Sequence, residues 1–107
     1  MTHLLNTPNI MVVDDTPANL RLLDELLRQQ GYQVRLFPRG ALALKAATVN
    51  PPDLILLDIM MPDMDGFEVA RRMREHPTAE SIPVIFVTAM TSVDARMKGM
   101  DLGAVDF

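Results

Sequence analysis

Cysteine and tryptophan are absent from this sequence of 107 residues, and tyrosine occurs once. Without cysteine the chain can form neither a disulfide framework nor a thiolate metal site. No uninterrupted apolar stretch approaches the roughly 20 residues that a membrane-spanning helix needs, and the N-terminus lacks the basic region and apolar segment of a signal peptide. We therefore expect a cytoplasmic protein without a membrane partner.

Positive charge is scarce as well. Ten Lys and Arg stand against 14 Asp and Glu, which gives a formal net charge of −4. Such a surface offers no electrostatic footprint for nucleic acid, so we expect no direct nucleic-acid binding. With 49% hydrophobic and 22% charged residues, the composition is that of one ordinary globular domain with an aliphatic core.

Two short apolar runs end in aspartate. Residues 10–13 lead into Asp14 and Asp15, and residues 54–57 lead into Asp58. Runs of this kind are typical of strands buried on both faces, and ligands bind at the carboxyl edge of such sheets. Three convergent carboxylates repel one another unless a cation offsets the charge, and hard oxygen ligands suit Mg²⁺. The pattern predicts an acidic metal pocket.

Strand and helix patterns alternate along the whole chain. We expect strands at 10–13, 33–37, 53–57 and 84–87. Helices should begin after Thr16 and after Asp65, and two more should span residues 40–50 and 91–103. No hairpin signal separates them, which favours an α/β fold with a parallel sheet and right-handed crossovers. Residues 104–107 resemble the opening of a fifth strand, so the fifth strand is expected to be incomplete and a fifth helix absent.

Two helix starts have recognisable caps. At the first, Thr16 precedes Pro17, which predicts a hydroxyl cap followed by proline at the first helical position. Gly31 is expected to end that helix. At the third helix, Asp65 is the predicted cap, and the helix should end before Pro77.

Taken together, these features resemble the receiver domain of two-component response regulators. The resemblance spans residues 9–107 and rests on the acidic pair, on Asp58, on the Met-Pro-Asp-Met-Asp-Gly loop at 61–66, and on Thr88 followed by Ala89. It implies a flavodoxin-like, doubly wound parallel sheet of order 2-1-3-4-5. Residues 1–107 would then be one receiver domain that stops before the end of its fifth strand.

The resemblance also implies a role for each matching residue. Asp58 would accept a phosphoryl group from a histidine kinase or a phosphotransfer protein. Asp15 would bind Mg²⁺ directly, Asp14 would assist through water or a secondary contact, and the backbone carbonyl of Met60 would complete the protein's share of the coordination. The domain would be a signalling module rather than an enzyme, limited to its own phosphorylation and slow dephosphorylation.

Two further positions follow from the same resemblance. Thr88 would hydrogen-bond the phosphoryl oxygens, and Phe107 falls at the family's aromatic switch position. The lysine that family members place on the fifth strand would lie three residues beyond Phe107. An output domain fused to the receiver in a longer protein is compatible with this pattern.

Two other classes of function fit parts of the sequence. A haloacid-dehalogenase-like phosphohydrolase also uses a strand-end aspartate with Mg²⁺, but it needs a second aspartate two residues later, where this chain has Met60. A receiver that docks or dimerises without phosphate is the other alternative. In the 107-residue chain we also expect self-association, through an uncovered sheet face or the edge of the fourth strand.

Overall fold

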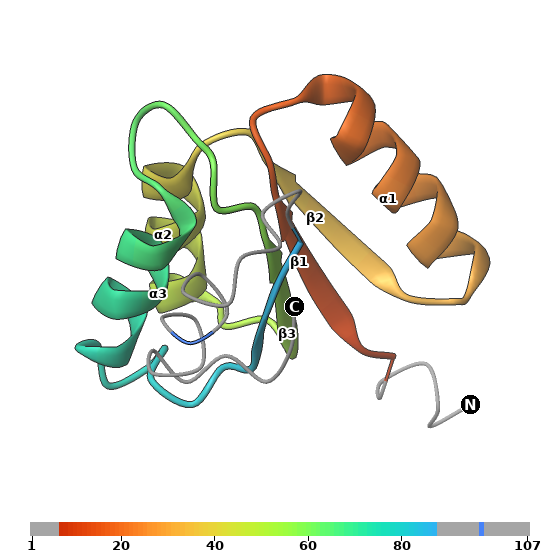
Figure 1. Ribbon diagram of the computed structural model, residues 1–107. Coiled ribbons are helices and arrows are strands. Elements are labelled where there is room, and N and C mark those ends of the chain that lie inside the picture. The colour runs from red at the N-terminus through yellow and green to blue at the C-terminus, as the bar shows by residue number, and fades with distance from the viewer. Residues whose placement is uncertain (1–6, 88–96, 98–107) are drawn as a thin grey trace.

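A four-stranded parallel sheet forms the centre of the molecule, which is described by a computed structural model (Figure 1). The structure describes residues 7–87 and Met97. The strand order is β2-β1-β3-β4, as predicted for the first four strands of a flavodoxin-like sheet. The elements in chain order are β1 (Asn9–Val13), α1 (Pro17–Gln29), β2 (Gln33–Phe37), α2 (Gly40–Val49), β3 (Leu54–Leu57), α3 (Gly66–Arg74) and β4 (Val84–Phe86).

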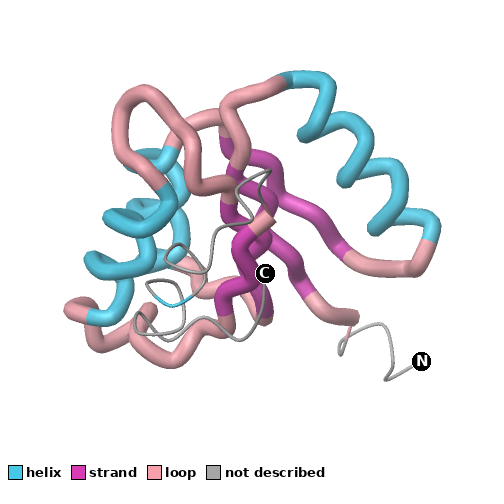
Figure 2. Tube along the Cα trace, in the orientation of Figure 1, coloured by secondary structure: helices cyan, strands magenta, loops and turns pink. Residues whose placement is uncertain are grey.

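Helices cover both faces of the sheet, with α1 on one side and α2 and α3 together on the other (Figures 1 and 2). The alternation of side chains along each strand accounts for this arrangement. In β1, Ile10 and Val12 face α1, whereas Met11 and Val13 belong to the core beneath α2 and α3. The central strands are therefore apolar on both faces.

The core beneath α2 and α3 is the larger of the two. It includes Phe67, Ala70 and Met73, which share one face of α3 as their spacing predicts, and the ring of Phe67 packs edge-on against that of Phe86 with centroids 5.2 Å apart. The smaller core lies under α1, where Leu20, Leu23 and Leu27 pack against the sheet.

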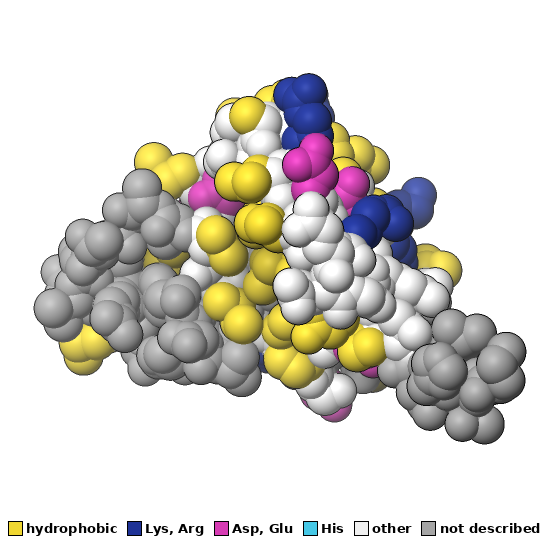
Figure 3. Space-filling model, turned by 90° about the vertical axis from the view of Figure 1, so that its right-hand side faces the viewer, with side chains coloured by type: hydrophobic (Ala, Val, Ile, Leu, Met, Phe, Trp, Pro, Cys, Tyr) yellow, Lys and Arg dark blue, Asp and Glu magenta, His cyan; other side chains and the backbone are white. Residues whose placement is uncertain are grey.

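The outer surface of α1 remains apolar in part. Leu22 and Leu26, one helical turn apart, are 56% and 49% exposed. Figure 3 views the molecule from this side and shows hydrophobic side chains gathered on it. A patch of this kind is a candidate contact surface.

Most of the predicted element boundaries agree with the structure to within one residue. β3 and β4 are each one residue shorter than expected, and α2 ends at Val49 rather than Asn50. Gly31 follows the end of α1 with a φ of 91°, a conformation that glycine adopts without strain. The predicted helix at 91–103 and the fifth strand at 104–107 fall outside the described residues.

One predicted feature of α1 is wrong. Thr16 does occupy the N-cap position before Pro17, but its side chain makes no capping hydrogen bond. At α3 the prediction is confirmed, since the Asp65 side chain accepts a hydrogen bond from the backbone N–H of Glu68. Within the part of the chain that the structure describes, no helix has the length and apolar character needed to cross a bilayer.

Candidate metal centre

The carboxyl ends of β1 and β3 bring three carboxylates together. The two strands pair in parallel with Val13 beside Leu57, and the backbone N–H of Asp58 extends the pairing by donating to the carbonyl of Val13 at 2.9 Å. Asp14, Asp15 and Asp58 each offer one oxygen, and these oxygens lie within 4.8 Å of one another. The structure therefore places the acids of the predicted pocket at one edge of the sheet.

Asp14 is the buried member of this cluster, with only 4% of its surface exposed. Its Oδ1 accepts a hydrogen bond from the backbone N–H of Thr16 at 2.9 Å, and its Oδ2 accepts one from Nδ2 of Asn19 at 3.2 Å. Asp14 thus supplies side-chain acceptors to the first turn of α1. The backbone N–H of Asn19, which a capping hydroxyl would bond, instead donates to the carbonyl oxygen of Thr16 at 3.0 Å.

Asp58 is partly buried, and its surroundings disfavour the ionised form of its carboxyl. Desolvation raises the pKa of its carboxyl above the ordinary value, and the neighbouring charges of Asp14 and Asp15 raise it further. Hydrogen bonds from backbone N–H groups, including that of Met60 at 3.3 Å, lower the pKa but do not outweigh these effects. A cation at this site would offset the same repulsion.

The chemistry of the donors fits a hard divalent cation. Three carboxylates offer oxygen ligands, and among the described residues no histidine belongs to the cluster. Asp15 is exposed, so its oxygens are free to reach a hydrated ion. Mg²⁺ suits this set because it keeps several waters and binds through one or two carboxylates.

A tight junction between β3 and α3 fixes the backbone that follows Asp58. The N–H of Gly66 donates to the carbonyl of Ile59 at 2.9 Å. A Cβ atom at Gly66 would lie 2.3 Å from the backbone oxygen of Asp58, so only glycine fits at this position. The first residue of α3 is therefore packed directly on the backbone of the central carboxylate.

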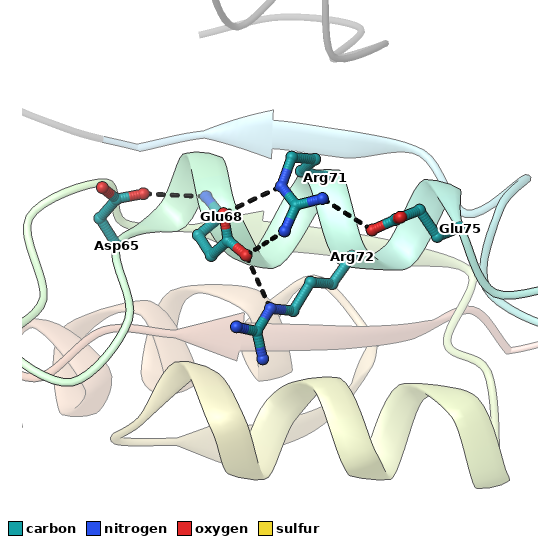
Figure 4. A network of polar contacts seen from close by, with 5 residues as sticks. All are labelled: Asp65, Glu68, Arg71, Arg72 and Glu75. Carbon is teal, nitrogen blue, oxygen red and sulfur yellow. Dashed lines mark hydrogen bonds and ion pairs between the residues drawn. The ribbon is translucent and has the colours of Figure 1, made fainter.

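Helix α3 carries a charged network on its outer surface (Figure 4). Glu68 forms ion pairs with Arg71 and Arg72, and Arg71 also pairs with Glu75. Side-chain hydrogen bonds from the two arginines lower the pKa of Glu68 to about 2. Because the network is exposed to solvent, we interpret it as support for the helix rather than as part of the metal centre.

Two residues that shape this site, Asn19 and Asp63, have no predicted role in the sequence. Nδ2 of Asn19 donates to Oδ2 of Asp14, a contact between side chains five residues apart that no capping motif specifies. Asp63 accepts a hydrogen bond from the backbone of Ala41, a partner 22 residues away that local sequence patterns do not reveal. The predicted switch residues Thr88 and Phe107 lie outside the described residues, and the role of the Met60 carbonyl stays a prediction.

Comparison with known proteins identifies the same pattern. A sequence model of the response regulator receiver domain matches residues 10–107. The response regulator PleD of Caulobacter vibrioides is 46% identical over 98 residues, which cover 92% of this chain and 22% of that protein. A probable cyclic di-GMP phosphodiesterase of Vibrio cholerae is 39% identical over 103 residues, or 96% of this chain and 23% of that protein. The chain thus spans less than a quarter of the length of either relative.

Solved structures agree with the sequence comparison. The N-terminal domain of a response regulator receiver protein from Methanoculleus marisnigri is 34% identical, with a TM-score of 0.85. The similarity covers 92% of this chain and 80% of that one, and so extends over nearly all of both chains.

Proposed function

Because this chain belongs to the response regulator receiver family, we propose that Asp58 is a phosphoacceptor that takes its phosphoryl group from a histidine kinase or a phosphotransfer protein. The observation that supports this most directly is the meeting of Asp58 with Asp14 and Asp15 at the carboxyl edge of the sheet. An isolated strand-end aspartate would have no such neighbours.

In the proposed transfer, an Asp58 carboxylate oxygen attacks phosphorus while the bond between phosphorus and the donor's histidine nitrogen breaks. The product is an acyl phosphate, and the electron pair of the broken bond stays on the histidine. Mg²⁺ bound by the acidic cluster would reduce the repulsion between the carboxylate and the phosphoryl oxygens. Asp15 and Asp14 would hold the ion, with the Met60 backbone carbonyl as a further ligand.

The new phosphoryl group would act as a signal through its charge. By analogy with other phosphorylated side chains it adds about 1.5 to 2 negative charges at neutral pH, enough to draw in a nearby hydroxyl. We assign that hydroxyl to Thr88 and the associated aromatic switch to Phe107. The domain would transmit a change of state to a partner and would not turn over a separate substrate.

We further propose that this domain acts on an output domain within a longer protein. The chain covers only 22% and 23% of the two relatives, and one of them is named as a probable cyclic di-GMP phosphodiesterase. Receiver domains are joined to many kinds of effector, so the activity that is controlled does not follow from this domain.

A direct test is to incubate the chain with Mg²⁺ and either acetyl phosphate or beryllofluoride, in parallel with Asp58→Asn. A stable adduct that requires Asp58 would support the proposal. Rapid turnover of unrelated phosphate esters would favour a phosphohydrolase, and no response at saturating Mg²⁺ would favour a phosphate-independent docking module. For the product of acetyl phosphate, hydroxylamine attacks the acyl carbon and releases phosphate, and mass spectrometry of the resulting hydroxamate identifies the modified residue.

A further inference from the structure

The first turn of α2 lacks a cap of its own. Arg39 occupies the N-cap position but makes no side-chain hydrogen bond, and the turn contains no acidic residue. The first N–H groups of a helix have no partner within the helix and need acceptors from elsewhere. In α2 one such acceptor comes from a distant part of the chain.

That acceptor is Asp63, in the loop between β3 and α3. Its Oδ2 lies 3.4 Å from the backbone N of Ala41, the second residue of α2, which is a position that an N-cap side chain normally bonds. Desolvation raises the pKa of Asp63, but hydrogen bonds from the backbone N–H groups of Ala41, Met64, Asp63 itself and Gly40 outweigh it, so the pKa lies below its ordinary value. Asp63 thus takes the place of the missing cap.

Close packing accompanies this hydrogen bond. A Cβ atom on Gly40 would lie 3.1 Å from the backbone oxygen of Met64 and 3.5 Å from Cε of Met61. Figure 1 shows the loop between β3 and α3 rising beside the start of α2. The start of α2 and the loop after Asp58 therefore contact each other through backbone as well as side chain.

We propose that Asp63 is a positioning residue for the phosphoacceptor loop, which it fastens to the start of α2. This inference rests on the proposed function. The loop leaves the sheet at Asp58 and is held at its far end by the Gly66 N–H bonded to the Ile59 carbonyl. Asp63 adds an attachment between these ends, in the segment that continues from Met60.

A loop that is already held in place loses less conformational freedom when it binds an ion. We therefore expect Asp63→Ala to weaken Mg²⁺ binding about fivefold, which is a loss of about 1 kcal/mol in binding free energy. Asp63→Asn keeps an acceptor for the Ala41 N–H but removes the charge. Its Mg²⁺ affinity should stay within about twofold of the wild type, because Asn and Asp cap helices about equally well.

Asp53→Ala is the matched control. The carboxylate of Asp53 also accepts a hydrogen bond from a distant backbone N–H, that of Asn9 at 2.7 Å, but it does so at the amino edge of the sheet, opposite the metal centre. The Asp53→Ala variant should lower the midpoint temperature of unfolding about as much as Asp63→Ala does, and it should leave the Mg²⁺ affinity unchanged. A purely structural role for Asp63 would give the two alanine variants the same behaviour.

The measurement is a Mg²⁺ titration followed by amide chemical shifts, with unfolding measured on the same samples. Three results would overturn the inference: unchanged affinity in Asp63→Ala, an equal loss in Asp63→Asn, or an equal loss in Asp53→Ala. Failure of the proposed function is distinguishable, because it appears as wild-type chain that binds Mg²⁺ but forms no Asp58 adduct. Wild-type chain that binds no Mg²⁺ would overturn both.

Discussion

The proposed transfer requires an ionised Asp58, yet the surroundings of this carboxyl oppose ionisation. Partial burial and the nearby carboxylates raise its pKa above the ordinary value of 3.8. The folded chain therefore holds the Asp58 proton more tightly than the unfolded chain does. By linkage, this residue lowers stability as the pH rises from 3.8 through the raised pKa.

Asp58→Asn should consequently stabilise the fold at pH 7 when no divalent cation is present. The expected gain in the free energy of unfolding is up to about 1 kcal/mol, since solvent screens a carboxyl that is only partly buried. The gain should shrink as the pH falls and vanish well below 3.8, where the wild-type carboxyl is neutral in both the folded and the unfolded state. Urea unfolding at a series of pH values measures this difference.

Mg²⁺ provides the internal control for that experiment. The ion stabilises the folded wild type by mass action, whereas a site without the Asp58 carboxylate should bind it more weakly. At saturating Mg²⁺ the stability advantage of Asp58→Asn over the wild type should therefore become smaller or reverse. If Asp58→Asn were no more stable than the wild type at pH 7 without the ion, carboxylate repulsion would not be a significant term in folding.

Glycine at position 66 is the second point at which a single residue constrains the site. In Gly66→Ala the new Cβ would meet the Asp58 backbone oxygen at 2.3 Å, and a strand backbone cannot move aside as a side chain can. We expect a loss of about 3 kcal/mol or more in unfolding free energy, at or above the usual range for overpacking.

Gly40→Ala serves as the comparison for Gly66→Ala. Its nearest obstacle is Cγ2 of Val69 at 2.7 Å, and its nearest backbone atom is the Met64 oxygen at 3.1 Å, so small adjustments can relieve the contact. The loss should be clearly smaller than at Gly66. If thermal denaturation showed equal losses of stability in the two variants, the backbone at Asp58 would be able to move more than its geometry indicates.

At the scale of single elements, local sequence predicts the cap of α3 correctly and that of α1 wrongly. Asp65→Ala should lower the free energy of unfolding by about 1 kcal/mol, because it removes the acceptor, at 2.8 Å, for the Glu68 N–H. Thr16→Ala should change it by less than about 0.5 kcal/mol, because the hydroxyl is not the cap of α1. Parallel denaturant titrations of the two variants test this contrast, and a larger loss for Thr16→Ala would contradict it.

The elements themselves were predictable because their signals are local. The apolar runs of β1 and β3 and the spacing of Phe67, Ala70 and Met73 on α3 depend only on neighbouring residues. The acceptors used by α1 and α2 were not predictable in this way. At α1 the backbone N–H of Asn19 bonds the Thr16 carbonyl rather than the Thr16 hydroxyl, and at α2 the acceptor is a carboxylate in another loop.

At the scale of the whole molecule, the sheet order determines the candidate site. Once β1 and β3 are parallel neighbours, the aspartates that follow them must converge, so the acidic pocket could be predicted from sequence. The difference in burial between the aspartates of the pocket could not be predicted from sequence. Burial of Asp14 and exposure of Asp15 depend on how the chain turns into α1, and this is set by the bonds from Thr16 and Asn19.

Self-association of the 107-residue chain, through an uncovered sheet face or the edge of the fourth strand, stays a prediction. The exposed leucines of α1 add a further candidate surface. Leu22 and Leu26 lie on the same stripe of the helix, and burial of such side chains favours association. Association also costs translational and rotational freedom, so we expect a weak complex with a Kd on the order of 0.1 to 1 mM. Analytical ultracentrifugation over a concentration series measures it.

A Leu22→Glu and Leu26→Glu double variant should be monomeric over the same range. Because it adds two negative charges to a chain of net charge −4, the control must add the same charge elsewhere. Leu42→Glu with Val49→Glu meets this need, since both residues are exposed on α2, across the sheet from α1. If both double variants dissociated equally, general charge repulsion would explain the effect. If the α1 variant still associated, the contact would lie elsewhere. The sheet face predicted to be uncovered and β4, the last strand of the sheet in the described residues, would be the next surfaces to test.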